Sequence, residues 1–92
     1  MEKLKILVVD DEERMRKLLQ DFLKMKDYEV LTAGDGEEAI DIFFQKKDIA
    51  LVILDVMMPK MDGWEVLKTI REHSKVPVIM LTARSEESDE LK

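Results

Sequence analysis

Three aspartates stand directly after two apolar runs of the chain. Asp10 and Asp11 follow "ILVV", and Asp55 follows "LVIL". A carboxylate at the end of a buried strand costs free energy unless it is paired, protonated or bound to a cation. Three carboxylates that converge would repel one another, and a hard divalent cation would relieve that repulsion. A set of oxygen ligands alone points to Mg2+, with Mn2+ or Ca2+ as alternatives.

A hydroxyl residue, Thr82, follows another apolar run, "VPVIML". Its hydroxyl and the neighbouring backbone amides could bind an anion beside the acids. A carboxylate, Mg2+ and an anion-binding hydroxyl are the parts of a phosphoryl-transfer site. Asp55 is the best candidate for the nucleophile, since a carboxylate can form an aspartyl phosphate and Asp55 stands alone on its strand. Asp10 and Asp11 would then be the metal acids.

Each of these residues, taken alone, also has a purely structural interpretation. Asp10 and Asp11 could charge the first turn of the helix that follows them. Asp55 could cap a turn before Pro59, and Thr82 could be a β-branched strand residue. Their occurrence together, at three predicted strand ends, favours the functional interpretation.

The elements that must position these residues alternate along the chain. Short apolar runs predict strands over residues 5–9, 28–33, 49–55 and 76–83, and helices are expected between them and after Ser85. Asp35 with Glu38, and Asp62 with Glu65, are spaced as capping boxes for two of the helices. This alternation predicts an α/β fold with a parallel sheet, helices on both faces, and ligands beyond the carboxyl ends of the strands.

Helical periodicity predicts which residues pack on the sheet. The apolar positions of the first helix recur at i, i+3, i+4, i+7 and i+8 and should share one face: Met15, Leu18, Leu19, Phe22 and Leu23. The larger aromatic residues of the later helices are also interpreted as core-facing: Phe43, Phe44 and Trp64. His73 is interpreted as solvated rather than catalytic.

Length and composition limit the function. The 92 residues suffice for one domain, and 21 acidic against 15 basic residues give a net charge of −6, which argues against nucleic-acid binding. No cysteine is present, which excludes disulfides and thiolate chemistry. No signal peptide is visible, and no run approaches the roughly 18 apolar residues of a membrane span. We therefore expect a cytoplasmic protein with no membrane contact.

Three segments, "ILVVDDEE", "LVILDVMMPKMDGWEVLKTIRE" and "VPVIMLTA", together resemble the receiver domain of bacterial two-component response regulators. The resemblance implies a flavodoxin-like fold, here with four strands in the order 2-1-3-4. It implies that Asp55 accepts a phosphoryl group from a sensor histidine kinase. It also implies that Asp11 binds Mg2+ directly, Asp10 through water, and Met57 through its backbone carbonyl.

The same resemblance implies that Thr82 is the switch hydroxyl, with the Ala83 amide beside the phosphate, and that Pro59 and Gly63 shape the loop after Asp55. Receiver domains also have a fifth strand ending in Lys-Pro and a fifth helix. The prolines here are Pro59 and Pro77, and neither follows a lysine. We therefore expect residues 1–92 to be a single receiver-like domain that lacks the fifth strand and helix.

Three functions follow from these expectations. The first is a phosphoacceptor signalling domain that assists its own phosphorylation and is not a turnover enzyme. The second is a phosphatase of the haloacid dehalogenase type, but that family requires an acid two residues after the nucleophile, where Met57 stands. The third is a truncated receiver fragment that associates with itself through the exposed edge of the fourth strand and no longer signals.

Overall fold

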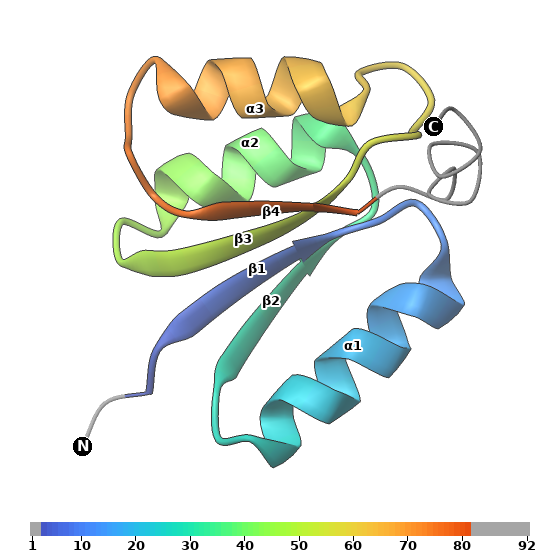
Figure 1. Ribbon diagram of the computed structural model, residues 1–92, viewed down its shortest axis with the longest axis vertical. Coiled ribbons are helices and arrows are strands. Elements are labelled where there is room, and N and C mark those ends of the chain that lie inside the picture. Colours follow the sequence, from blue (N-terminus) through green and yellow to red (C-terminus); the bar gives the residue numbers. More distant parts are fainter. Residues whose placement is uncertain (1–2, 82–92) are drawn as a thin grey trace, which may run out of the picture.

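The computed structural model describes residues 3–81 of the 92. Its strands form one parallel sheet in the order β2-β1-β3-β4 (Figure 1), as the sequence predicts. The strands are β1 (Lys5–Val9), β2 (Glu29–Ala33), β3 (Ile49–Asp55) and β4 (Val78–Leu81). The helices are α1 (Glu13–Met25), α2 (Gly36–Gln45) and α3 (Gly63–Arg71). None of the described helices is long and apolar enough to cross a bilayer.

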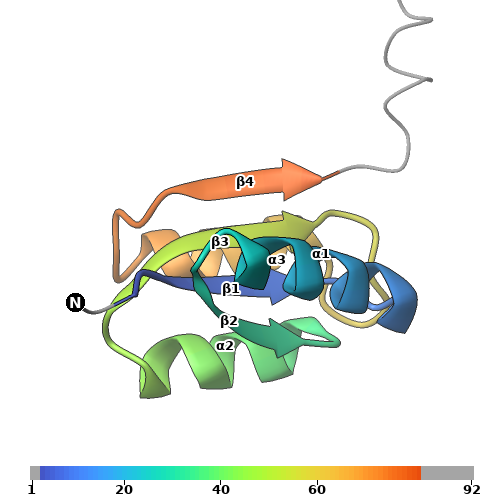
Figure 2. The same cartoon turned by 90° about the horizontal axis from the view of Figure 1, so that it is seen from below.

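Helices cover both faces of the sheet. Side chains of β1 alternate between the faces, so that Leu7 and Val9 point to one core cluster and Ile6 and Val8 to the other. The larger cluster lies under α2 and α3, and the smaller one under α1 (Figure 1). All four strands point the same way (Figure 2). Their carboxyl ends therefore meet at one edge of the sheet.

Two of the three described helices begin at the predicted caps. The Asp35 carboxylate accepts a hydrogen bond of 2.8 Å from the Glu38 N–H at the start of α2. At α3, Asp62 and Glu65 form a complete capping box, with reciprocal bonds of 3.1 and 3.2 Å. Each cap satisfies amide groups that have no partner inside the helix. The α3 cap also fixes where the loop after β3 ends.

The prediction that the large apolar residues of the helices all face the core was partly wrong. α1 has no buried residue, and of its apolar stripe only Leu19 and Leu23 pack on the smaller cluster. The side chains at the borders of the helix stripes are exposed: Leu18, Phe22, Phe44 and Trp64. Phe43 is buried as predicted. Periodicity identifies a stripe, but the width that is buried depends on the surface opposite, and α1 packs chiefly against β1 and β2.

The fourth strand begins later than predicted. Pro77 has no N–H to donate and β4 starts at Val78, although the Pro77 carbonyl still accepts a bond of 3.0 Å from the Val52 N–H. The predicted switch residues Thr82 and Ala83, and the helix expected after Ser85, lie outside the described residues.

Candidate acidic site at the carboxyl end of the sheet

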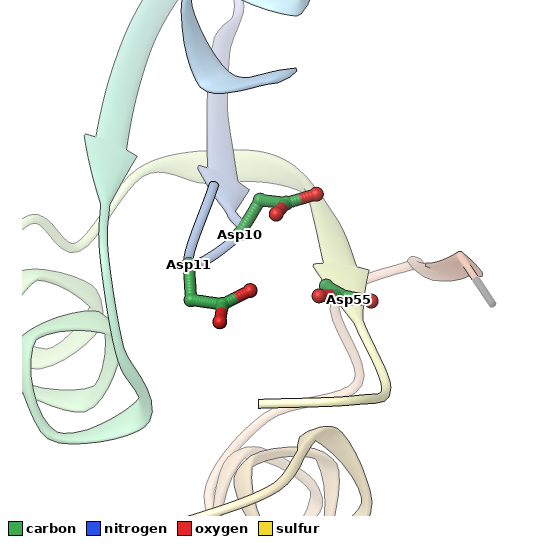
Figure 3. A group of neighbouring side chains, drawn as sticks. All are labelled: Asp10, Asp11 and Asp55. Carbon is green, nitrogen blue, oxygen red and sulfur yellow. The ribbon is translucent and has the colours of Figure 1, made fainter. Parts of the chain in front are cut away.

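The structure brings Asp10, Asp11 and Asp55 together. β1 and β3 are neighbours, with Val9 opposite Leu54, so the residues that follow β1 lie beside the last residue of β3. One carboxylate oxygen from each aspartate lies within 4.8 Å of the others. The three carboxylates gather in the space beyond the two strand ends (Figure 3).

Backbone hydrogen bonds hold the first acid in place. The Asp10 N–H donates to the Ala33 carbonyl at the end of β2, at 3.1 Å, and its carboxylate accepts from the Glu12 N–H at 2.9 Å. Asp10 is 6% exposed, whereas Asp11 is exposed to solvent. The pair therefore offers one fixed, buried carboxylate and one that reaches into the pocket from its rim.

Asp55 is the last residue of the inner strand β3 and is largely buried. It is 9% exposed, and one of its carboxylate oxygens accepts a bond of 3.3 Å from the Met57 N–H. Burial raises the pKa of Asp55 above its ordinary value, and the negative charges of Asp10 and Asp11 add to the rise, while the Met57 amide opposes it. The ionised form of Asp55 is therefore destabilised unless positive charge approaches.

A cleft of about 560 Å³ opens over the three acids. Its described lining combines carboxylates with apolar side chains: Asp10, Asp11, Glu12, Met15, Leu19, Asp55, Met57 and Leu81. Oxygen ligands in a cleft of this size suit a hydrated Mg2+ ion, which keeps several waters and takes few protein ligands. The residues present therefore fit the metal that the sequence predicts, and they leave room for an anion beside it.

The loop after β3 depends on the glycine at its end. The Gly63 N–H donates to the Val56 carbonyl at 2.9 Å, and this bond closes the loop. A side chain at position 63 would start 2.8 Å from the Val56 Cα, closer than real contacts allow. Within the loop, Lys60 adopts a positive φ of 68°. Gly63 thus lets α3 begin directly against the backbone that carries Asp55.

One residue at the site was missed by sequence reasoning. The Arg16 Nη1 donates to the backbone carbonyl of Asp10 at 2.7 Å. Arg16 lies six positions after its partner, on a different element, and no motif or periodicity marks it. Its contact with a backbone atom becomes visible only when α1 is packed against the end of β1.

These features define a flavodoxin-like α/β protein with an acidic pocket at the carboxyl end of its sheet. The chain belongs to the response regulator receiver domain family, whose model matches residues 6–92. It is therefore a receiver domain of the two-component response regulator type.

Curated relatives agree with this assignment. The chain is 53% identical over 89 residues to a "probable transcriptional regulator ycf27" of Cyanophora paradoxa, covering 97% of this chain and 37% of the relative. It is 43% identical over 84 residues to the transcriptional regulatory protein SrrA of Staphylococcus aureus, covering 91% of this chain and 34% of the relative. The chain thus spans little more than a third of these relatives.

Solved structures share the fold. The response regulator TrrA of Thermotoga maritima, in complex with Mg2+ and BeF, matches with a TM-score of 0.85 and 45% identity, covering 96% of this chain and 73% of that one. A complex of the histidine kinase ThkA with TrrA matches with a TM-score of 0.81 and 46% identity, covering 87% and 69%.

Proposed function

We propose that the chain accepts a phosphoryl group on Asp55 from a sensor histidine kinase, with Mg2+ bound beside it. The observation that carries the proposal is the approach of the Asp10, Asp11 and Asp55 oxygens to within 4.8 Å of one another. The Asp10, Asp11 and Asp55 carboxylates and the Met57 carbonyl would hold the metal. Bound there, Mg2+ supplies positive charge to offset the negative charge of the transferring phosphoryl group.

The protein's own groups account for the rest of the reaction. A carboxylate oxygen of Asp55 attacks phosphorus as the N–P bond of a phosphohistidine breaks, and the imidazole leaves as the phosphoryl group becomes an aspartyl phosphate. The Met57 N–H donates a hydrogen bond to a carboxylate oxygen of Asp55 and so orients that side chain. Thr82 and the Ala83 amide, which come directly after β4 in the sequence, are proposed as the groups that bind the phosphoryl oxygens.

Two comparisons support the metal and the kinase. TrrA was solved in complex with Mg2+ and BeF, and in complex with the histidine kinase ThkA. We infer the same kind of metal and partner for this chain, and a cytoplasmic location as in the sequence-based expectation. The module acts as a substrate and switch that assists its own phosphorylation, with residues 1–92 as one domain.

Two alternative functions make different demands on the site. A haloacid dehalogenase-type phosphatase requires an acid at position 57, and the membership of the receiver family also counts against it. A fragment that associates with itself without signalling would have the same fold but would not respond to Mg2+ and a phosphoryl analogue. Ligand binding therefore separates that alternative from the proposal.

The test is a titration with Mg2+ followed by beryllofluoride, read by the fluorescence of Trp64. Trp64 is 59% exposed and lines a small pocket with Met57, next to the acidic cleft. Wild-type protein should respond to both additions. Asp11→Ala should weaken Mg2+ binding by about tenfold or more, because metal affinity is sensitive even to groups behind the ligands. Asp21→Ala, an exposed acid paired with Lys17 on α1, is the matched control and should bind as wild type. Unchanged affinity in Asp11→Ala would contradict the assignment.

A further inference from the structure

Arg16 donates a hydrogen bond to the backbone between two of the acids, Asp10 and Asp11. Its Nη1 donates to the Asp10 carbonyl oxygen at 2.7 Å, and that carbonyl belongs to the peptide joining Asp10 to Asp11. Arg16 forms no ion pair among residues 3–81. Hydrogen bonds from a charged donor are roughly twice as strong as neutral ones. The guanidinium is therefore used to hold a peptide group rather than to neutralise a carboxylate.

The same guanidinium lies against the loop that follows β2. A methyl group at Gly34 would stand 3.1 Å from the Arg16 Nη1 and 3.6 Å from its Cζ. The preceding residue, Ala33, accepts the Asp10 N–H at 3.1 Å. Arg16 thus joins the start of α1, the end of β1 and the loop after β2 at a single point, and that point is the backbone of the acid pair.

We propose that Arg16 is a positioning residue for the metal acids. It holds the peptide from which Asp10 and Asp11 project, so that both carboxylates face Asp55 before any cation arrives. The Asp10 carboxylate has a second restraint in the Glu12 N–H. Asp11 is exposed, and the backbone on either side of it sets the direction of its Cα–Cβ bond. This inference rests on the proposed Mg2+ site.

A second arginine supplies a matched comparison. The Arg71 Nη1 donates to the Val76 carbonyl at 2.6 Å and closes the connection between α3 and β4. This is the same type of bond, from guanidinium to backbone carbonyl, but it lies before the amino end of β4, at the opposite edge of the sheet from the acids. Loss of the Arg71 bond should lower stability without affecting the acidic pocket.

The experiment compares Mg2+ affinity with folding stability in Arg16→Gln, Arg16→Lys and Arg71→Gln. Trp64 fluorescence gives the affinity, and urea unfolding gives the stability. Arg16→Gln should bind Mg2+ about tenfold more weakly, in the range found when groups behind metal ligands are removed. Arg16→Lys keeps the charge and should recover part of that loss. Arg71→Gln should lose stability yet bind Mg2+ as wild type.

Gly34→Ala tests the same contact from the other side. No glycine in the described chain has a positive φ, so alanine at position 34 adds only a methyl group, which would press on the guanidinium at 3.1 Å. It should weaken Mg2+ binding in the wild-type background and have no further effect in Arg16→Gln, because both changes disturb one interaction.

The outcomes distinguish this inference from the proposed function. Wild-type affinity in Arg16→Gln, or effects of Gly34→Ala and Arg16→Gln that add independently, would overturn the role of Arg16 while leaving the Mg2+ site intact. Failure of the wild-type protein to bind Mg2+ would instead overturn the site itself. Weak binding in both Arg16→Gln and Arg71→Gln would show that general destabilisation, not positioning, is responsible.

Discussion

At the scale of single residues, the acidic site destabilises the metal-free fold, because its carboxylates lie close together and two of them are buried. Asp55 is almost fully buried beside the buried Asp10, and burial and neighbouring charge both raise the pKa of Asp55. Keeping an ionised Asp55 beside the other two acids therefore lowers the stability of the fold in the absence of a cation. A cation that enters the cleft offsets this repulsion, so cation binding raises the stability of the whole domain.

Asp55→Asn should therefore stabilise the metal-free protein at neutral pH. A pKa that is raised in the folded state means that stability is greatest below the unfolded pKa and is lost as pH rises through the folded value. The variant removes that loss, so its melting temperature should exceed that of wild type at pH 7, and the difference should shrink as pH falls towards 4. Thermal unfolding at several pH values, without divalent cations, measures this.

Asp48→Asn is the control with the opposite sign. A hydrogen bond of 2.7 Å from Lys5 holds the pKa of the exposed Asp48 below its ordinary value. The Asp48 carboxylate contributes to stability above its unfolded pKa, and this contribution is lost as pH falls, so Asp48→Asn should be slightly less stable than wild type at pH 7.

A lower melting temperature for Asp55→Asn than for wild type at pH 7 would contradict the prediction, because it would show that the ionised Asp55 carboxylate does not destabilise the fold.

At the scale of elements, the described sheet has an incompletely covered side. Within residues 3–81, β4 pairs with β3 alone, and the Ile79 side chain, on the same face as Ile53, is 49% exposed. On the same side of the sheet as Ile53, α1 presents Leu18 and Phe22 to solvent. An open strand edge beside exposed apolar side chains is a template for another chain.

We predict that the 92-residue chain associates with itself through the edge of β4. Sedimentation velocity over a range of concentrations should show a dimer in equilibrium with monomer. Ile79→Lys should shift the equilibrium to monomer, since lysine on an edge strand opposes pairing. Leu4→Lys replaces a similarly exposed apolar residue, 60% accessible, away from that edge and should leave association unchanged. A monomer at all concentrations, with slow amide exchange in β4, would refute the prediction.

At the scale of the whole molecule, the fold and the convergence of the acids could be predicted from the sequence. Alternating apolar runs and helical caps specify a parallel sheet, and the carboxyl ends of its strands must share one edge. The pattern alone brings Asp10 and Asp55 together only if β1 and β3 are neighbours, and the resemblance to receiver domains supplied that strand order. The exposure of Phe22 and Trp64 could not be predicted, because it depends on how much of each helix the sheet and the neighbouring helices cover.

Contacts between a side chain of one element and the backbone of another could not be predicted from the sequence either. Arg16 is one of several basic residues on α1, and nothing in its spacing separates it from the exposed Arg14. Its contact arises from the angle at which α1 leaves the sheet. Patterns within the sequence report which face is buried, whereas a bond to a distant carbonyl requires the packed structure.

The central claim is that Asp55 is a phosphoacceptor, and mass spectrometry of the phosphorylated protein tests it most directly. Incubation with acetyl phosphate and Mg2+ should add one phosphoryl group, and peptide mapping after borohydride reduction should place it on Asp55. The addition should disappear without Mg2+ and in Asp55→Asn, and it should persist in Asp41→Asn, an exposed acid on α2. Equal phosphorylation of Asp55→Asn and wild type, or no phosphorylation of a wild-type protein that binds Mg2+, would contradict the account.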